Sequence, residues 1–568
     1  MLRENAVHTD RSVTFVRANG QELAVSYPDL WVEAKRRAFA LAALGLKKGD
    51  RVALILPEPD EFVLTFIGAL AGGFVAVPMY PPQTLAKLEA YGDTVRHVLA
   101  ASGAKVLVTN DTLRPLIEEH LAKRANARVV LEKDLRAPEG FTGQTPEPVA
   151  LEDLAFLQFT SGSTSRPKGV MVTHENLSVN SHAIMFDGLR STPADRGVSW
   201  LPLYHDMGLI GFVIAPLYAL VQVMFLPTMA FIRRPSLWLD AIHRFRGTIT
   251  FAPNFAYALA TRAVTEGQAA TWDLSCMRAL GCGAEPIQAD VLRAFLERFG
   301  KHGLKPESIL PSYGMAEATL AITFHDVTKP LKTDRVDLDA MRAGKAKPAN
   351  GKASLELVSC GRPFPGHEIA IMSPTGQRLG ERQVGEVWLR GPSVTAGYFG
   401  NPEATAESFG GGWLHTGDLA YVADGDLYIC GRAKDLIILN GKNFYPQDVE
   451  RVASKVDGIR DGQCVAFSRL DASGGEIAVV VAEARKASPA LCDAIVQAVR
   501  TELGLTISEV HLIKRSTLPK TSSGKVRRRE CKRRLEENEL ELLVAGEAED
   551  SIAPPPMSSV EFRTQGAI

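Results

Sequence analysis

Apolar runs that suit buried strands alternate with amphipathic stretches that suit helices through most of the chain. The strand-like runs include RVALILP from Arg51, AKVLVTN from Ala104 and GTITFAP from Gly247, and the helix-like stretches include Leu85 to Ala101 and Ile287 to Phe299. Between Glu381 and Tyr428 the pattern changes to short strands separated by Gly, Asn and Asp turns. The alternation predicts α/β architecture with helices packed on sheets, and the later change predicts a β-rich subdomain.

Two uncharged stretches are about as long as a membrane span, namely Phe62 to Pro82 and Met207 to Pro227. Gly72 and Gly73 break the first stretch, and Pro216 and Gln222 interrupt the second. We therefore predict a buried helix followed by a buried strand in each, and a protein that is not transmembrane. A membrane span is the alternative for the second stretch.

The length of 568 residues predicts at least two domains. We expect a large N-terminal domain over residues 1–431, with two α/β subdomains and the β-rich subdomain. A small α+β domain should follow over 432–545, containing the apolar run EIAVVVAEA and a helix from Leu491 to Leu503, and then a disordered tail over 546–568. The polar stretch 329–357 is interpreted as a surface insertion, with an ordinary variable loop as the alternative.

Composition narrows the functional classes. The formal net charge of −1 gives no global basic field that would recruit nucleic acid. Seven scattered cysteines without a CxxC pair argue against a disulfide framework or a structural zinc site, and MLRENAVHTD has no apolar leader segment, so a cytoplasmic protein is predicted.

The basic run KVRRRECKRR precedes the acidic LEENELE, which predicts a solvated helix with i,i+4 ion pairs; a docking site for an acidic partner is the alternative.

The segment FTSGSTSRPKGV, from Phe159 to Val170, is the strongest chemical signal. Small hydroxyl and glycine residues let backbone N–H groups and hydroxyls close around phosphate oxygens, and Lys168 can offset negative charge during phosphoryl or nucleotidyl transfer. The Gly-Lys-Ser/Thr ending of a Walker A loop is absent. A Ser/Gly-rich loop alone could equally be a plain turn.

With this string the chain resembles the adenylate-forming superfamily of acyl-CoA synthetases, luciferases and peptide-synthetase adenylation domains. Six further segments match that family in order: WLPLYHDMGL from Trp200, GCGAEP from Gly281, SYGMAEATL from Ser312, WLHTGDLA from Trp413, GRAKDLIILNGKNFYPQDVE from Gly431 and PKTSSGKVRR from Pro519. The resemblance spans about Thr14 to Leu535. It implies an enzyme that uses ATP and Mg²⁺ to convert a carboxylic acid to an acyl-adenylate, with release of pyrophosphate.

The resemblance also implies a nucleotide site. Its candidate residues are Thr160, Ser161, Gly162, Ser163, Thr164, Gly283, Ala284, Glu285, Pro286, Ser312, Tyr313, Gly314, Met315, Ala316, Asp418 and Arg432. Gly281, Gly283 and Ala284 would leave room for a flat ring against the backbone. Tyr313 offers an aromatic face for the base, although a buried Tyr is often part of the core. Asp418 could simply stabilise its turn, but the resemblance makes it the acceptor for both ribose hydroxyls, joined by Arg432.

Four catalytic residues follow from the same comparison of motifs: Lys168, His205, Glu317 and Lys525. Glu317, with Thr160, is the candidate Mg²⁺ ligand, and a helix-surface position is its alternative. His205 would lie near the substrate carboxylate and α-phosphate unless it is a core histidine. Lys525 could be one more solvated lysine, but in similar enzymes this residue swings in with the small domain to contact the carboxylate and phosphate. Lys434 matches the residue on which that domain pivots.

Three segments resemble one branch of the superfamily, the fatty acyl-AMP ligases: VPMYPP at Val77 to Pro82, WLPLYHDMGLIG, and GKNFYPQDVE at Gly441 to Glu450. The insertion 329–357 falls where these ligases carry a segment thought to hamper the rotation that admits coenzyme A. The acyl group then passes to the phosphopantetheine thiol of a separate carrier protein. The alternatives are a fatty acyl-CoA synthetase and a non-catalytic module that binds acyl-adenylate.

One departure from the family pattern lies in the phosphate loop. Ser165 stands where the family usually has Gly. If that position requires a positive φ, a serine there is strained, which puts the detailed shape of the loop in doubt.

Overall fold

The computed structural model describes residues 1–82, 88–121, 127–135, 148–160, 166–351, 353–439, 441–460, 462–471, 475–521 and 525–543. The chain divides into two compact units. The first comprises residues 1–435 together with 520–525, and the second comprises 436–519 and the chain from 526 onward. The predicted tail, 546–568, lies outside the described residues. Both units combine helices with sheets, so the predicted α/β class is confirmed.

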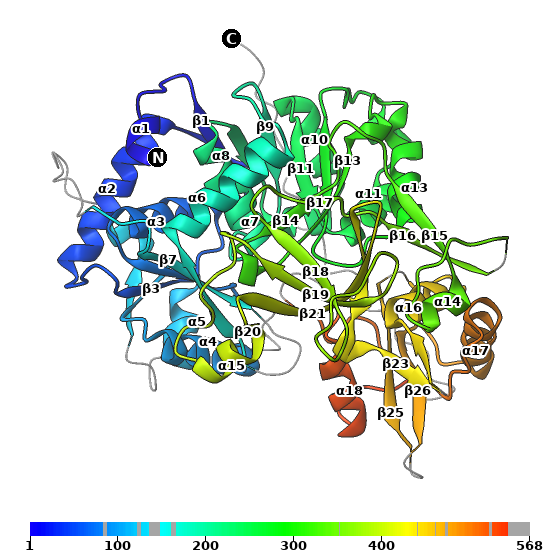
Figure 1. Ribbon diagram of the computed structural model, residues 1–568. Coiled ribbons are helices and arrows are strands. Elements are labelled where there is room, and N and C mark those ends of the chain that lie inside the picture. Colours follow the sequence, from blue (N-terminus) through cyan, green and yellow to red (C-terminus); the bar gives the residue numbers. More distant parts are fainter. Residues whose placement is uncertain are drawn as a thin grey trace. The chain divides into compact units, whose positions relative to one another are not determined.

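A six-stranded sheet forms the first layer of the large unit, in the order β6-β5-β3-β4-β7-β8, and Figure 1 labels its strands β3 and β7. Its strands are β3 (Arg51–Leu54), β4 (Val75–Pro78), β5 (Val106–Thr109), β6 (Arg128–Leu131), β7 (Leu154–Thr160) and β8 (Lys168–Thr173). Its neighbouring helices are α2 (Tyr27–Ala43), α3 (Pro59–Ala71), α4 (Leu88–Ser102) and α5 (Arg114–Leu121). The strands β3 to β7 are parallel, and β8 turns back antiparallel to β7. This reversal creates the hairpin that carries the predicted phosphate loop.

A nine-stranded sheet forms the second layer, in the order β17-β14-β13-β12-β11-β9-β10-β1-β2. Its strands are β1 (Ser12–Val16), β2 (Glu22–Ser26), β9 (Arg196–Ser199), β10 (Gln222–Phe225), β11 (Ile249–Ala252), β12 (Ala279–Cys282), β13 (Ile309–Gly314), β14 (Ala321–Phe324) and β17 (Arg362–Pro363). Its helices include α6 (His174–His182), α9 (Thr228–Arg233), α10 (Ser236–Phe245), α11 (Asn254–Ala263), α12 (Glu266–Ala269) and α13 (Ala289–Gly300). The central strands β9 to β13 are parallel and fully buried for most of their length, as their apolar sequences predict.

The two uncharged stretches have the predicted structure. The first forms α3 and then β4, with Gly73 at a φ of +69° in the turn between them. The second forms one continuous helical segment from α7 (Asp206–Leu209) through a π-helical turn (Ile210–Ile214) to α8 (Ala215–Tyr218), followed by β10. Among the described residues, no helix is both long and apolar enough to cross a bilayer.

The β-rich subdomain is confirmed as a five-stranded sheet in which β18, β19, β21 and β20 follow one another and β22 pairs with β21. Its strands are β18 (Glu368–Met372), β19 (Gly385–Arg390), β20 (Phe409–Gly410), β21 (Trp413–Ala423) and β22 (Asp426–Arg432), with α15 (Pro402–Ser408) leading into β20. The β21–β22 register places Asp418 directly opposite Arg432. These two residues, which the resemblance assigns to the same ribose, are therefore cross-strand neighbours.

The described residues of the insertion form regular secondary structure. It contains β15 (Thr333–Asp337), α14 (Leu338–Arg342) and β16 (Ser354–Val358), and the two strands pair antiparallel. Asp334 forms an ion pair with Arg382 at 2.9 Å and accepts a 2.8 Å hydrogen bond from the Tyr421 hydroxyl. Glu356 binds the guanidinium of Arg293 on α13 through both carboxylate oxygens. Two anchors of this kind hold the insertion against the rest of the large unit.

The second unit is built on the three-stranded sheet β25-β26-β27 and a short hairpin, β23–β24. Its elements are β23 (Ile437–Leu439), β24 (Lys442–Phe444), α16 (Pro446–Ser454), β25 (Cys464–Leu470), β26 (Glu476–Glu483), α17 (Pro489–Leu503), β27 (Glu509–Ile513) and α18 (Arg528–Glu536). In α18 and the residue that follows it, Arg533 pairs with Glu537 and Arg534 pairs with Glu530, each four positions apart, which confirms the predicted helix with i,i+4 ion pairs.

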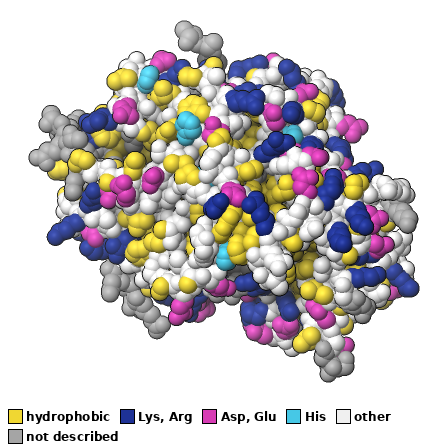
Figure 2. Space-filling view, in the orientation of Figure 1, with side chains coloured by type: hydrophobic (Ala, Val, Ile, Leu, Met, Phe, Trp, Pro, Cys, Tyr) yellow, Lys and Arg dark blue, Asp and Glu magenta, His cyan; other side chains and the backbone are white. Residues whose placement is uncertain are grey.

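The surface carries charges of both signs. On the face shown in Figure 2, Lys and Arg side chains are interspersed with Asp and Glu and with small apolar areas. This mixture agrees with the formal net charge of −1.

Candidate active site

The hairpin β7–β8 presents the first candidate residues at its open end. Thr160 ends β7, Lys168 begins β8, and the two are paired in the register of the sheet. Four predicted phosphate-loop residues, Ser161, Gly162, Ser163 and Thr164, lie outside the described residues, as does Ser165. The pairing of β7 with β8 nevertheless fixes the positions of Thr160 and Lys168, which lie at the two ends of this segment.

Lys168 and Glu317 are joined by a residue that the sequence analysis missed. The Lys168 Nζ lies 4.8 Å from the centroid of the Tyr398 ring, within the range of a cation–π contact. The Tyr398 hydroxyl donates a 2.8 Å hydrogen bond to Glu317 Oε1. Glu317 lies in a 3₁₀ turn, η6 (Ala316–Ala318), just after β13. A buried Tyr hydroxyl generally needs a partner, but no sequence signal identifies a carboxylate 81 positions away.

Asp418 is the centre of a second group. It is only 6% exposed, accepts a 2.8 Å hydrogen bond from the Tyr313 hydroxyl, and forms an ion pair with Arg432 Nε at 2.9 Å. Burial raises the pKa of Tyr313 well above its ordinary value, and the charge of Asp418 adds to this. The same charge raises the pKa of Arg432 against the opposing effect of burial. Tyr313 therefore keeps its proton and donates to Asp418, rather than belonging only to the core.

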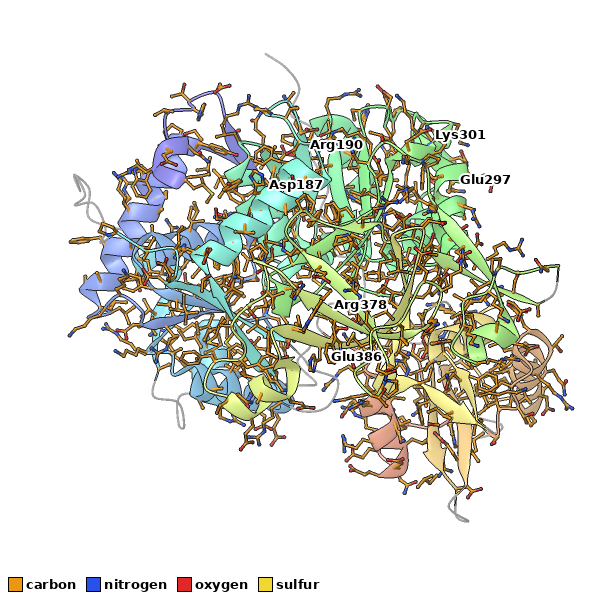
Figure 3. All side chains as sticks on the ribbon, in the orientation of Figure 1. Asp187, Arg190, Glu297, Lys301, Arg378 and Glu386 are labelled. Carbon is orange, nitrogen blue, oxygen red and sulfur yellow. The ribbon has the colours of Figure 1, made fainter. Side chains whose placement is uncertain are left out.

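The turn before Asp418 is held by two side-chain contacts. The backbone N–H of Asp418 donates to Thr416 Oγ1 at 3.0 Å, and the N–H of Gly417 donates to Glu386 Oε1 at 2.9 Å. Gly417 has a φ of +70°, which is costly for other residues. Figure 3 labels Glu386, which lies on β19, and Arg378, which precedes that strand. Glu386 supports the turn although no motif pointed to it.

The structure contradicts the expectation that Gly281, in the GCGAEP loop, leaves room for a base. A Cβ on Gly281 would lie 2.0 Å from the Phe251 ring, and one on Gly283 would lie 2.6 Å from Ser312 Oγ. The space beside Gly281 is thus filled by protein, so this glycine does not provide room for a base. Ala284 is exposed and has a φ of +70°. Packing within the protein explains both glycines.

The remaining predicted residues around this loop have structural contacts. Glu285 accepts a 2.6 Å hydrogen bond from the N–H of Phe255 near the start of α11, and burial raises the pKa of Glu285. Ser312 donates to the carbonyl of Cys282 at 3.2 Å, which ties β13 to β12. Pro286 is exposed, and Gly314, Met315 and Ala316 continue the chain from β13 to η6.

His205 immediately precedes α7, and its Nδ1 lies 3.5 Å from Asp206 Oδ1. Burial acts to raise the pKa of Asp206, but the hydrogen bond and charge of His205, followed by the charge of Lys525, together lower it. Burial lowers the pKa of Lys525, against the charges of Asp206 and Glu285. Lys525 is thus grouped with the large unit, within reach of the charges of Asp206 and Glu285, and is not a freely solvated lysine. Asp206 was noticed in the sequence only as part of a branch motif.

The predicted pivot, Lys434, is in the 3₁₀ turn η7 (Ala433–Asp435) that ends the first unit's main segment. Its Nζ lies 3.4 Å from Glu407 Oε1, and both side chains are largely exposed. Its role as a hinge stays a prediction.

The two groups of contacts adjoin each other. Tyr313 and Glu317 lie four residues apart on the β13–η6 segment, and the charge of Glu317 contributes to the raised pKa of Arg432. Lys168, Glu317 and Asp418 are therefore brought into one region through Tyr398, Tyr313 and Arg432. This arrangement offers a cation and a carboxylate beside a buried acceptor, as a nucleoside triphosphate requires.

Glu317 and Thr160 are compatible with Mg²⁺. Tyr398 engages only Oε1 of Glu317, which leaves the second oxygen as a ligand. No cluster of three or more His, Cys, Asp or Glu side chains that could hold a metal occurs in the described part of the chain. A single carboxylate suits Mg²⁺, which in nucleotide sites is held largely by phosphates and water.

Two family models match the chain. A model of AMP-binding enzymes matches residues 2–399, and a model of the AMP domain of Disco-interacting protein 2-like proteins matches residues 434–544. The first match covers more than half of the chain and includes the hairpin, the GCGAEP loop and Tyr398.

Three curated relatives align over most of their length. A putative acyl-CoA synthetase of Caulobacter vibrioides is 38% identical over 518 residues, which are 90% of each chain. The long-chain-fatty-acid–AMP ligase FadD26 of Mycobacterium tuberculosis is 35% identical over 85% of this chain and 86% of its own. The medium-chain-fatty-acid–acyl-carrier-protein ligase JamA of Moorena producens is 32% identical over 92% of each chain.

A solved structure from a study of fatty acyl-adenylate ligases of E. coli and L. pneumophila has the same fold. It superposes with a TM-score of 0.88 and 36% identity, covering 95% of this chain and 97% of the other. By its sequence matches, its fold and the grouping of its motif residues, this chain belongs to the AMP-binding, adenylate-forming enzymes and, within them, to the fatty acyl-AMP ligases.

Proposed function

We propose that this ligase activates a fatty acid with ATP and Mg²⁺ and then transfers the acyl group to the phosphopantetheine thiol of a separate acyl carrier protein. The observation that carries the proposal is the convergence of two groups on the β13–η6 segment. Tyr313, Asp418 and Arg432 supply a ribose site, while Lys168 and Glu317 supply opposite charges for the phosphates.

In the first half-reaction, a carboxylate oxygen of the fatty acid attacks the α-phosphorus, a new P–O bond forms, and the bond to pyrophosphate breaks. Asp418 holds the ribose hydroxyls, which fixes the nucleotide at the end remote from the phosphates. Lys168 and Lys525 offset the charge that builds on the phosphate oxygens. Mg²⁺, held by Glu317 and Thr160 together with the phosphates, would neutralise the leaving pyrophosphate.

His205 and Asp206 orient the reacting groups. Burial acts to raise the pKa of Asp206, but the hydrogen bond and charge of His205, the charge of Lys525 and the N–H of Met207 together lower it, so Asp206 stays ionised. A charged Asp206 in turn favours the protonated form of Lys525. The pair therefore helps to retain the proton that Lys525 needs in order to stabilise phosphate charge.

In the second half-reaction, the carrier thiol attacks the acyl carbon of the mixed anhydride, and AMP leaves. We propose that the domains 1–431 and 432–545 reorient about Lys434 between the two steps. We also propose that the reaction takes place in the cytoplasm; none of the seven cysteines forms a disulfide and most are buried, which supports this location.

The acyl acceptor distinguishes the proposal from its nearest alternative, a fatty acyl-CoA synthetase. That alternative is favoured by one observation, the 38% identity to a putative acyl-CoA synthetase. The carrier protein is favoured by the relative named as a carrier-protein ligase and by the folded insertion, whose anchors at Asp334 and Glu356 give it a defined position. The names of the relatives include both long-chain and medium-chain ligases, so chain length is left to experiment.

The test has two stages. Fatty acids of graded length are first assayed for acid-dependent exchange of pyrophosphate into ATP, and exchange is expected with at least one of them. Absence of exchange, together with saturable binding of acyl-adenylate, would instead support a non-catalytic binding module. The best acid is then supplied with ATP and either coenzyme A or a holo carrier protein. Acyl-carrier formation is expected, and rapid acyl-CoA formation would contradict the proposed acceptor.

A further inference from the structure

Tyr398 lies in the sequence GYFG, between β19 and α15, and is 7% exposed. Its segment runs antiparallel beside β8. The N–H of Met171 donates to the carbonyl of Gly397 at 3.0 Å, and the N–H of Phe399 donates to the carbonyl of Gly169 at 2.8 Å. Tyr398 is therefore fixed opposite Val170, two residues from Lys168.

The same segment is tied to the turn that carries Glu317. The N–H of Thr395 donates to the carbonyl of Glu317 at 2.9 Å. The N–H of Tyr398 itself donates to Thr405 Oγ1 at 3.0 Å, on α15. Backbone contacts thus hold Tyr398 against both the Lys168 strand and the Glu317 turn, which leaves its side chain little freedom to move.

The Tyr398 side chain makes two contacts, one through its ring face and one through its hydroxyl. Its ring face meets the Lys168 ammonium at 4.8 Å, and its hydroxyl binds one oxygen of Glu317 at 2.8 Å. Within the described residues, no carboxylate lies within 4.0 Å of the Lys168 ammonium. The aromatic side chain therefore contacts two opposite charges, the Lys168 ammonium through its ring and the Glu317 carboxylate through its hydroxyl.

We propose that Tyr398 is a positioning residue that keeps the phosphate-binding cation and the metal-binding carboxylate apart and correctly oriented. This inference rests on the proposed function, because it assigns Lys168 to the phosphates and Glu317 to Mg²⁺. A flexible Lys and Glu at close range attract each other, and a pair of this kind would neutralise both groups. The Tyr398 hydroxyl orients the Glu317 carboxylate through Oε1. The Tyr398 ring attracts the Lys168 ammonium less strongly than a phosphate would.

The two contacts can be separated by substitution. Tyr398→Phe removes the hydrogen bond to Glu317 but keeps the ring under Lys168, whereas Tyr398→Leu removes both. Binding of α,β-methylene-ATP is measured by calorimetry with and without Mg²⁺, so that the readout does not depend on turnover. The Mg²⁺ dependence of pyrophosphate exchange is measured in parallel.

For Tyr398→Phe, we expect the gain in affinity that Mg²⁺ provides to fall about tenfold, while affinity without metal stays unchanged. For Tyr398→Leu, we expect the same loss of the metal effect and a further loss of about threefold to tenfold without metal, because Lys168 can then pair with Glu317. If Tyr398→Leu does not fold, a double-mutant cycle of Tyr398→Phe with Glu317→Gln replaces it. The two effects on the metal gain should then be far less than additive.

Tyr421→Phe is the matched control, because it removes a hydrogen bond of the same kind and length, from a buried Tyr hydroxyl to Asp334 in the insertion. It should lower thermal stability about as much as Tyr398→Phe without changing the metal gain. The inference is overturned if Tyr398→Phe keeps the full metal gain, if it loses affinity equally with and without Mg²⁺, or if Tyr421→Phe has the same effect. If the wild-type protein shows no acid-dependent exchange, the proposed function fails, and the binding data still decide the role of Tyr398.

Discussion

The proposed ribose and phosphate ends of the active site hold their charged residues in different ways. At the ribose end, Asp418 is buried and already paired with Arg432 and Tyr313, and its turn is fixed by Thr416 and Glu386. At the phosphate end, Lys168 faces an aromatic ring and Glu317 has one hydrogen bond from the same ring's hydroxyl.

This difference follows from the chemistry at each end. A ribose is neutral, so the protein must hold its own charged acceptor in place, and a permanent partner such as Arg432 makes burial of Asp418 tolerable. Phosphates and Mg²⁺ bring charges of their own, so a strong internal ion pair would compete with them. At the proposed phosphate end, Lys168 and Glu317 accordingly make only the ring contact and the hydrogen bond with Tyr398, and neither contact neutralises a charge.

The largest effect should come from Lys525→Ala, because a group that acts only on the transferring phosphate contributes to the reaction and little to binding. We expect adenylate formation in single-turnover assays to fall about 10²-fold to 10³-fold. Nucleotide affinity, measured by calorimetry, should change little. An equal loss of affinity would mean that Lys525 is a binding residue, and the contrast between the two ends would weaken.

In contrast to Lys525→Ala, the substitution Asp418→Asn should act mainly on nucleotide affinity. It removes the charge that pairs with Arg432 and the acceptor proposed for the ribose, so affinity for AMP and ATP should fall together by about 10-fold to 100-fold. Asp424→Asn is the control, since Asp424 is exposed on the same β21–β22 hairpin and has a φ of +53°, which Asn tolerates. Loss of ATP affinity without loss of AMP affinity would place Asp418 at the phosphates instead.

The pH dependence of adenylate formation should further distinguish the proposed phosphate end from the proposed ribose end. Burial lowers the pKa of Lys525, so its protonated form is lost at a lower pH than that of an exposed lysine, whose pKa is about 10.4. Adenylate formation should therefore decline as pH rises, while AMP affinity stays constant over that range. Lys525→Arg should move this alkaline decline to higher pH. An unchanged decline in that variant would assign it to another group.

The smallest effect is expected from Glu386→Ala, which removes only a hydrogen bond to the turn before Asp418. Affinity for AMP should fall about threefold to tenfold, and Glu386→Gln should recover most of it because an amide oxygen can still accept from Gly417. Glu381→Ala, at an exposed position just before β19, should have no effect on AMP binding. If Glu386→Gln and Glu386→Ala lower AMP affinity equally, the charge of Glu386 and not its hydrogen bond is responsible.

Several features of the fold could be predicted from the sequence because they depend on local pattern. The alternation of apolar strands and amphipathic helices identified the α/β class, and Gly72–Gly73 correctly marked the break between α3 and β4. The i,i+4 charges of α18 were equally visible. The insertion could be located from the sequence, but its contacts could not be predicted, because they join Asp334 to Tyr421 and Glu356 to Arg293, which lie 87 and 63 positions apart.

The sequence by itself determined which chemical groups this enzyme carries, because residues such as Lys168, Glu317 and Asp418 lie in motifs whose composition already limits their chemistry. Only the tertiary structure decided how those groups are held. Tyr398 and Glu386 act on partners 81 and 31 positions away, and the space at Gly281 is filled by Phe251 from another strand. The physical reason is that hydrogen bonds, ring contacts and steric exclusion act over a few ångströms in space, whatever the separation along the chain.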